Sequence, residues 1–173
     1  MNFFIMPCEI LVFGDTHAQL FTDIPKILIK AISKADWVIH VGDFTSEKVL
    51  NRIIELKSSH FYGVYGNSDP LSIRKKLPSK NVICFNNIKI GFTHPVIGGP
   101  STLTEKRVLT EFKDKNLDVI IYGHTHESKI EKKANKVIIN PGKGYLEENT
   151  FGPHLTYVIL TLDDEINAEI RKI

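Results

Sequence analysis

Short motifs made of metal-binding residue types recur along this chain, each directly after a glycine. They are Gly14-Asp15-Thr16-His17, Gly42-Asp43, Gly66-Asn67 and Gly123-His124-Thr125-His126. Aspartate, asparagine and histidine together offer oxygen and nitrogen ligands without a thiolate. Such a set suits manganese, iron, cobalt, nickel or zinc better than an oxygen-only calcium or magnesium site. His94 is a further candidate, although a threonine precedes it.

The candidate ligands are more numerous than one ion requires. They are Asp15, His17, Asp43, Asn67, His94, His124 and His126. A tetrahedral ion takes four ligands, whereas two ions that share a carboxylate use the whole set. Metal pairs about 3.5–4 Å apart are the usual arrangement in two-metal catalysis. The sequence therefore predicts a binuclear metal centre.

The motifs follow apolar runs that have the length of buried strands. These runs cover residues 9–13, 37–41, 61–65, 88–93 and 118–122. Apolar side chains at helical spacing predict helices over 23–34, 45–57 and about 102–113, the first with Asp23 as N-cap and Pro25 in its first turn. Alternating strands and helices with right-handed crossovers give a parallel sheet, and ligands gather beyond the carboxyl ends of such strands. The motifs are therefore expected to lie together at one edge of the sheet.

The middle and end of the chain have a different pattern. Residues 82–94 predict a hairpin with Asn86-Asn87 as its turn, and short antiparallel strands follow residue 128. The sequence shows no internal repeat, linker or low-complexity segment. The expected fold class is α/β: a single-domain four-layer α/β/β/α sandwich of two mixed sheets flanked by helices, occupying residues 1–173.

Composition excludes several function classes. The chain has 173 residues, 42% hydrophobic and 24% charged, with a net charge of +2, which is typical of a globular domain. The one dense basic run, Arg74-Lys75-Lys76, is interpreted as a solvated loop, so the nucleic-acid signal is weak. No segment approaches the roughly 20 apolar residues of a membrane span. Cys8 and Cys84 are expected to be buried and reduced, and the location cytoplasmic.

In their order and spacing the motifs resemble the metallophosphoesterase (calcineurin-like) superfamily, and more closely its small single-domain YfcE-type branch. The resemblance covers residues from about 9 to 142 and includes Ile139–Gly142, the INPG that this branch carries after GHTH. It implies a metal-dependent phosphoesterase, and specifically a phosphodiesterase, that hydrolyses P–O bonds with a water activated by two metals. A small phosphate ester is the expected substrate, and no particular one is indicated.

The resemblance also implies a role for each candidate. The first metal would be held by Asp15, His17 and His126, the second by Asn67, His94 and His124, with Asp43 bridging them. Asn67 would also stabilise charge on the phosphoryl oxygens. Two divalent transition-metal ions are expected, manganese first, with nickel, cobalt, iron or zinc as alternatives.

Two positions depart from the pattern of the family. Many members have a histidine after Gly-Asn that protonates the leaving group, whereas this chain has Ser68. A serine hydroxyl is too weak an acid for that task, which favours diesters or good leaving groups. Asp69, counted with Asp43 and Asn67 as catalytic, or else His154, is the substitute donor. Pro95 follows His94 where the branch has glycine.

Several residues receive a structural interpretation. His40, inside an apolar strand, is expected in the core or beside a ligand, His60 on the surface, and His154 in a loop. Lys143 is expected to be solvated, with contact to an anionic substrate as the alternative.

Two other functions compete with this interpretation. The retromer scaffold subunit resembles the same branch and acts as a protein-interaction surface; its ligand positions are eroded, whereas here each position holds a competent residue. DNA-repair nucleases share the metal core but carry a capping domain, for which this chain has no room, so only cleavage of small diesters is retained. A homodimer is left open.

Overall fold

The computed structural model describes residues 7–85, 87–144 and 154–173 of the chain. Its strands are β1 (Cys8–Phe13), β2 (Trp37–His40), β3 (Phe61–Gly63), β4 (Lys80–Phe85), β5 (Ile88–Thr93), β6 (Val119–Tyr122), β7 (Lys129–Lys133), β8 (Lys136–Asn140), β9 (Thr156–Leu162) and β10 (Ile166–Lys172). Its helices are α1 (Lys26–Lys34), α2 (Glu47–Lys57), α3 (Leu71–Arg74) and α4 (Ser101–Glu111), with 3-10 turns η1 (Phe21–Asp23) and η2 (Ser58–His60).

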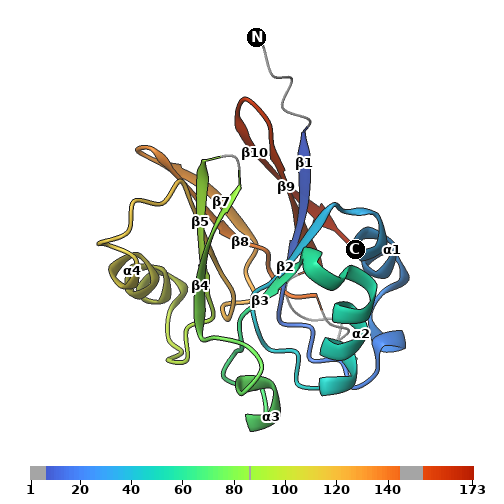
Figure 1. Ribbon diagram of the computed structural model, residues 1–173. Helices are drawn as coiled ribbons and strands as arrows, with labels where there is room; N and C mark the ends of the chain where they lie inside the picture. The colour runs from blue at the N-terminus through green and yellow to red at the C-terminus, as the bar shows by residue number, and fades with distance from the viewer. Residues whose placement is uncertain (1–6, 86, 145–153) are drawn as a thin grey trace.

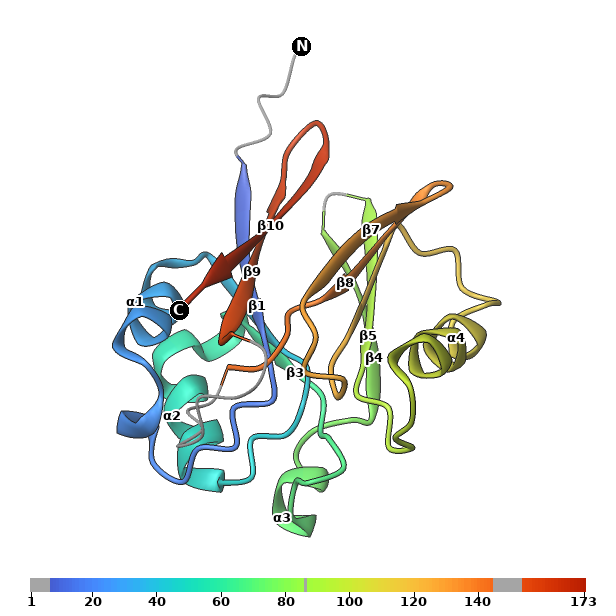
Figure 2. The ribbon, with the colours of Figure 1, turned by 180° about the vertical axis from the view of Figure 1, so that it is seen from behind.

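The strands form two five-stranded sheets. The first has the order β10-β9-β1-β2-β3 and the second β4-β5-β6-β8-β7. Both are mixed: β1, β2 and β3 are parallel while β9 runs antiparallel to β1, and β5, β6 and β8 are parallel while β4 and β7 are antiparallel to their neighbours. Helices α1 and α2 cover the outer face of the first sheet and α4 that of the second (Figures 1 and 2). The predicted four-layer α/β/β/α sandwich is confirmed.

The alternation of side chains along the strands explains why the layers stack. In β1, Ile10 and Val12 belong to the core between the sheets, whereas Leu11 and Phe13 belong to the core under α1 and α2. Because successive side chains of a strand point to opposite faces, a strand covered on both sides must be apolar throughout. The four residues are all fully buried. This is why the strands before the motifs appear as unbroken apolar runs.

Helix α4 is attached to the second sheet by a charged cluster beside its apolar contacts. The carboxylate of Glu105 accepts hydrogen bonds from Tyr122 Oη at 3.2 Å, Lys129 Nζ at 2.6 Å and Lys133 Nζ at 2.7 Å. Burial alone raises the pKa of Glu105, but the two lysines more than offset this and lower it. Burial, together with the same carboxylate, raises the pKa of Tyr122 to about 12. Glu105 therefore stabilises the fold as an anion.

We expect Glu105→Gln to reduce the free energy of unfolding at pH 7 by about 1–2 kcal/mol, allowing for screening at the half-exposed lysines. Because the folded-state pKa of Glu105 is lowered, its contribution is complete above the unfolded value of about 4.3 and is lost as pH falls through the folded value. Urea unfolding at pH 7 and pH 3 measures this. Glu55→Gln, at an exposed carboxylate paired with Arg52, is the control and should change little. A deficit in Glu105→Gln that persists at pH 3 would contradict the charge argument.

The structure differs from the sequence expectation at several local points. Helix α1 begins at Lys26 rather than near Asp23, because the Asp23 carboxylate accepts the Leu20 amide and ends the separate turn η1. Helix α3, which follows Pro70, was not predicted. Cys8 and Cys84 are both free thiols, but Cys8 is only half-buried and Cys84 is exposed, so the expectation of two buried cysteines is wrong.

The predicted hairpin of β4 and β5 is present. Of its expected turn, Asn87 has φ of 72°, and Asn86 lies outside the described residues. None of the helices in the described ranges has the length and apolar character needed to cross a membrane.

Candidate metal centre

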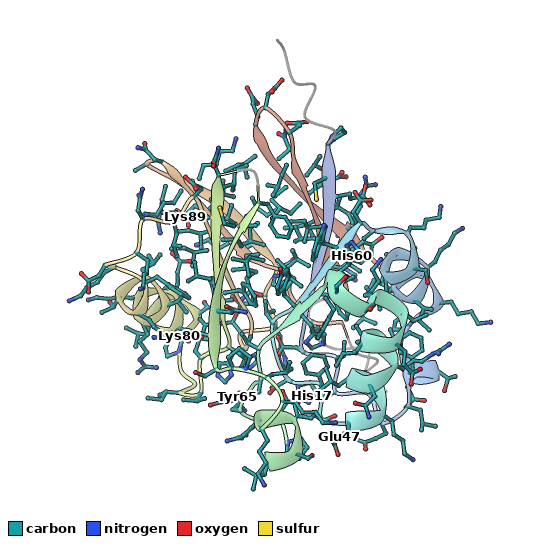
Figure 3. The ribbon with its side chains drawn as sticks, in the orientation of Figure 1. His17, Glu47, His60, Tyr65, Lys80 and Lys89 are labelled. Carbon is teal, nitrogen blue, oxygen red and sulfur yellow. The ribbon has the colours of Figure 1, made fainter. Side chains whose placement is uncertain are left out.

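The candidate ligands converge at one edge of the molecule. Asp15, Asp43 and Asn67 follow β1, β2 and β3, which are neighbours in the first sheet, while His94 and His124 follow the neighbouring strands β5 and β6 of the second. Figure 3 places His17 at this edge together with Tyr65 and Glu47, far from Lys89 at the start of β5. The topology thus brings the ends of both sheets to one place.

The backbone at the candidate ligands is unusual. Nine non-glycine residues in the described ranges have positive φ, and five of them are candidate ligands: Asp15 (49°), His17 (41°), Asp43 (58°), His124 (86°) and His126 (60°). Such conformations cost about 1–3 kcal/mol each and concentrate where function requires them. Glycine is also required at two positions in these loops, because neighbouring atoms leave no room for a side chain. A β-carbon at Gly66 would lie 2.1 Å from Asp43 Oδ1, and one at Gly123 would lie 2.8 Å from Val41 O.

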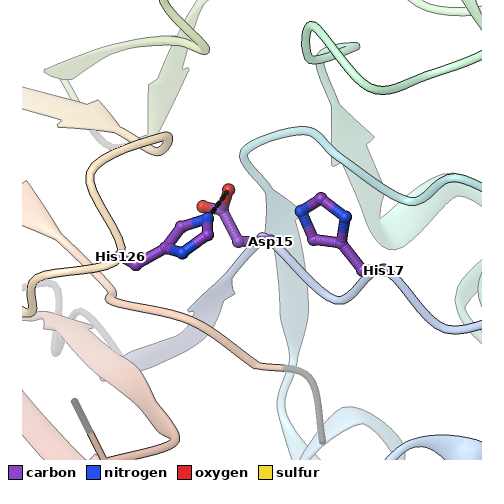
Figure 4. A group of neighbouring side chains, drawn as sticks. All are labelled: Asp15, His17 and His126. Carbon is purple, nitrogen blue, oxygen red and sulfur yellow. Dashed lines mark ion pairs between the residues drawn. The ribbon is translucent and has the colours of Figure 1, made fainter. Parts of the chain in front are cut away.

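One cluster contains Asp15, His17 and His126, whose potential ligand atoms all lie within 4.8 Å of one another (Figure 4). His126 Nε2 lies 3.2 Å from Asp15 Oδ1. Asp15 is fully buried, and its Oδ2 accepts the backbone amide of His124 at 3.1 Å. Apart from the ion-pair contact with His126, its buried Oδ1 accepts no hydrogen bond within the described residues. A buried carboxylate oxygen with unused acceptor capacity fits a cation.

A second cluster contains Asp15, Asp43 and His94, again within 4.8 Å. Next to it, Asn67 Oδ1 lies 3.1 Å from His94 Nε2 and 2.8 Å from His124 Nδ1. His94 Nδ1 lies 2.7 Å from the carbonyl of Val41, which can only accept. In its neutral form this ring keeps its proton on Nδ1 and turns the Nε2 lone pair toward the amide oxygen of Asn67. Two acceptors facing each other also fit a cation between them.

Asp43 connects the two groups. Its Oδ2 lies 3.4 Å from His17 Nε2 and 3.5 Å from His94 Nε2. Its burial by itself raises the pKa, but the hydrogen bond from His17, the charge of His94 and the amide of Ser68 more than offset this, so the pKa of Asp43 lies well below its usual range. Asp43 is therefore an anion at neutral pH.

Ser68 and Asp69 hold Asp43 in place. The Ser68 amide donates to Asp43 Oδ1 at 2.8 Å and its hydroxyl to Oδ2 at 3.0 Å. The carboxylate of Asp69 is buried and accepts three backbone amides: those of Asp43 at 3.0 Å, Gly66 at 2.8 Å and Thr45 at 2.8 Å. Both residues were considered in the sequence only for proton donation, and these contacts were missed.

His40 links the loop that carries Asp15 to the loop that carries Asp43. It is fully buried, stacked on Phe44 with ring centroids 3.5 Å apart, and burial lowers its pKa well below the usual value, so it is neutral. Its Nδ1 accepts the Gly42 amide at 3.1 Å, so the proton is on Nε2, which donates to Thr16 Oγ1 at 3.1 Å. The Thr16 hydroxyl then has its proton free for the Asp43 carbonyl at 3.4 Å. The expectation of a histidine in the core or beside a ligand agrees with this position.

The hydroxyl of Thr16 gives this linkage a direct test. We expect Thr16→Val, which keeps the shape but leaves the His40 proton without a partner, to lower the free energy of unfolding by about 1–3 kcal/mol. Thr16→Ser, which restores the hydroxyl, should recover most of the loss. Denaturant unfolding of the two variants in the presence of chelator measures the effect apart from any metal. Equal destabilisation by valine and serine would contradict the hydroxyl linkage.

Two further residues missed in the sequence position the remaining loops. Asn140, the asparagine of INPG, donates to Thr125 Oγ1 at 2.9 Å and accepts the Gly142 amide at 2.9 Å, which ties it to the GHTH loop. Arg74 donates to the carbonyls of Asp69 at 2.7 Å and Asn67 at 2.8 Å. The basic run is thus not merely a solvated loop.

The other singled-out residues lie apart from these clusters. His60 is exposed, as expected, and packs on the ring of Trp37. His154 is exposed and belongs to neither cluster in the described residues. Lys143 is only 3% exposed, so the expectation of a solvated lysine is wrong. A cavity of about 540 Å³ beside α4 is lined by Glu105, among others, and by none of the candidate ligands.

The chain can now be compared with known proteins. Residues 8–165 match the family model described as the calcineurin-like phosphoesterase superfamily domain. A probable metallophosphoesterase of Methanocaldococcus jannaschii is 30% identical over 172 residues, which cover 98% of this chain and 84% of the relative.

Two solved structures share the fold. An archaeal phosphodiesterase superposes with a TM-score of 0.66 at 28% identity, over 94% of this chain and 99% of the other. The zinc complex of Vps29 from Entamoeba histolytica superposes with a TM-score of 0.67 at 21% identity, over 95% and 98%. The family match spans the segment that carries all seven candidate ligands, and the chain belongs to the calcineurin-like phosphoesterase superfamily.

Proposed function

We propose that this chain is a metal-dependent phosphodiesterase whose residues 1–173 act as one catalytic domain with a binuclear centre. The observation that carries the proposal is the position of Asp43, whose Oδ2 lies within 3.5 Å of a histidine from each ligand group. The relatives named as a metallophosphoesterase and a phosphodiesterase support the reaction class.

Each residue has a definite task in this proposal. Asp15, His17 and His126 would hold one ion, Asn67, His94 and His124 would hold the other, and both groups would share Asp43. When bound, the two ions would supply Lewis-acid charge that makes water nucleophilic at neutral pH and offsets negative charge on the phosphoryl group. Manganese is the first choice, with nickel, cobalt, iron or zinc as alternatives, because the donor set is mixed oxygen and nitrogen.

The protein contributes positioning and one hydrogen-bond donor of its own. Since Asn67 Oδ1 faces His94 and His124, its Nδ2 amide is left to donate, and it now lies 3.3 Å from Ser68 Oγ. Asn67 is exposed, so a phosphoryl oxygen can reach this amide. Asp69 is committed to three backbone amides, and we assign it a positioning role rather than that of leaving-group acid. Diesters with good leaving groups are therefore the preferred substrates.

The test is hydrolysis by metal-stripped protein to which manganese, nickel, cobalt, zinc or magnesium is returned separately. Bis(p-nitrophenyl) phosphate and p-nitrophenyl phosphate are compared at equal concentration. Restoration by a transition metal with faster diester than monoester turnover is expected. Faster monoester turnover would overturn the diester preference, and no turnover with any metal would overturn the enzymatic function.

A protein-interaction scaffold is the second candidate. The specific observation in its favour is a pair of exposed apolar side chains, Val96 and Ile97, next to the site, together with the shared fold of Vps29. The residues at the ligand positions weigh against it, because all seven are able to bind a metal and a scaffold does not need such residues. Two bound ions without turnover would favour the scaffold.

A further inference from the structure

The segment between His94 and α4 carries two aliphatic side chains that face solvent. Val96 is 58% exposed and Ile97 is 60% exposed. Large aliphatic side chains left in water forgo the stabilisation that burial provides, so a pair of neighbours exposed beside a polar site calls for a function.

This segment lies directly against the proposed centre. A β-carbon at Gly98 would be only 3.2 Å from His124 Nε2. The other nitrogen of that ring, Nδ1, is 2.8 Å from Asn67 Oδ1. The chain that carries Val96 and Ile97 therefore starts at one candidate ligand and crosses beside another.

The segment is held in this position by α4. Arg107 Nη1 donates to the carbonyl of Ile97 at 3.3 Å and to that of Gly98 at 3.0 Å. Pro95 and Pro100 flank the four intervening residues and fix φ at both ends. An apolar surface held in place before a ligand arrives binds it with a smaller entropic loss.

The side-chain chemistry of the segment determines what it can recognise. Residues 95–100 are Pro-Val-Ile-Gly-Gly-Pro, without a single polar side-chain atom. The guanidinium that approaches the segment is already bonded to its carbonyls. A sugar or other polar group placed here would exchange hydrogen bonds with water for contact with methyl groups. An aromatic or branched aliphatic group would gain by burial.

We propose that Val96 and Ile97 form an apolar lip that binds the ester group which stays on phosphorus, so that the enzyme selects phosphodiesters of an apolar alcohol. The proposal rests on the phosphodiesterase function, because it requires the phosphoryl group to sit among the seven ligands. A phosphodiester has two ester groups. With one departing toward solvent, the other is available for the lip.

The test uses two diesters that share a chromogenic leaving group. These are phenyl p-nitrophenyl phosphate and methyl p-nitrophenyl phosphate, assayed with the manganese-loaded protein. We expect kcat/KM to favour the phenyl diester by roughly tenfold beyond the ratio of their uncatalysed rates, as hydrophobic contacts of this size provide. The double variant Val96→Ser, Ile97→Ser should lose about tenfold of that ratio, mainly through a higher KM for the phenyl diester.

Leu56→Ser is the matched control. Leu56 is also an exposed aliphatic residue, 38% exposed, but it lies near the end of α2, which runs back from the site edge. In Leu56→Ser the ratio of kcat/KM for the phenyl diester to that for the methyl diester should equal the ratio of the unaltered protein. Because all three positions are exposed, the substitutions are not expected to unfold the chain.

The outcomes separate the two proposals. A ratio that is unchanged in the double variant, or no phenyl preference in the unaltered protein, would overturn the lip and leave the phosphodiesterase standing. Absence of turnover of both diesters would overturn the phosphodiesterase and the lip with it.

Discussion

Replacing Asp43 by asparagine is expected to lower kcat/KM for a chromogenic phosphodiester by more than about 100-fold, since even substitution of a neighbour of a metal ligand costs up to that amount. Asparagine keeps the shape and one oxygen for the Ser68 amide, now 2.8 Å from Asp43 Oδ1. It removes the negative charge and the second anionic oxygen that two cations share. Steady-state kinetics with saturating metal measure the loss.

The matched control is Asp36→Asn. Asp36 precedes β2 and Asp43 follows it, so the two carboxylates mark opposite ends of one strand. Asp36 accepts the Glu9 amide at 2.8 Å and lies in neither cluster of candidate ligands within the described residues. Its variant should retain activity within about twofold, as expected for a change away from the site. Full activity in Asp43→Asn would contradict the proposal that two cations share this carboxylate.

The largest loss of stability is expected from Asp69→Ala. The buried backbone amides of Asp43 and Gly66 and the half-buried amide of Thr45 would be left without this acceptor. At about 1–3 kcal/mol each, with partial relaxation, the free energy of unfolding should fall by roughly 3–5 kcal/mol. Asp69→Asn, which keeps one carbonyl oxygen for the Asp43 and Gly66 amides, should lose less. Urea unfolding of both variants with chelator present measures these values.

The same pair of variants distinguishes positioning from proton donation. An acid that protonates the leaving group controls one limb of the pH–rate profile, and its replacement removes that limb. A residue that only positions Asp43 changes the rate at every pH and leaves the profile shape unaltered. We expect Asp69→Asn to lower kcat with an unchanged profile. Loss of a limb would restore Asp69 to the role of acid.

The sequence could single out these candidate ligands because most of them are marked by local chemistry. An apolar run, a glycine and then Asp, Asn or His can be recognised without knowledge of the fold. Strand alternation with helices then implied that Asp15, Asp43 and Asn67 share an edge, and the structure places them there. Four layers followed from the same pattern.

The supporting contacts could not be predicted because their partners meet only after folding. Asp69 accepts amides from Asp43 and Thr45, which lie 26 and 24 residues before it. His40 reaches Thr16 across 24 residues. Nothing local distinguishes an aspartate that binds amides from one that donates a proton, or a lysine that becomes buried, such as Lys143, from a solvated one.

The number of metal ions bound per chain is the sharpest test of the binuclear centre. Metal-stripped protein is titrated with manganese by calorimetry, and the loaded protein is analysed for metal after gel filtration. We expect two ions per chain in the unaltered protein and fewer in Asp43→Asn, with Asp36→Asn unchanged. One ion or none in the unaltered protein, or two ions retained with unaltered affinity in Asp43→Asn, would contradict a binuclear centre that shares this carboxylate.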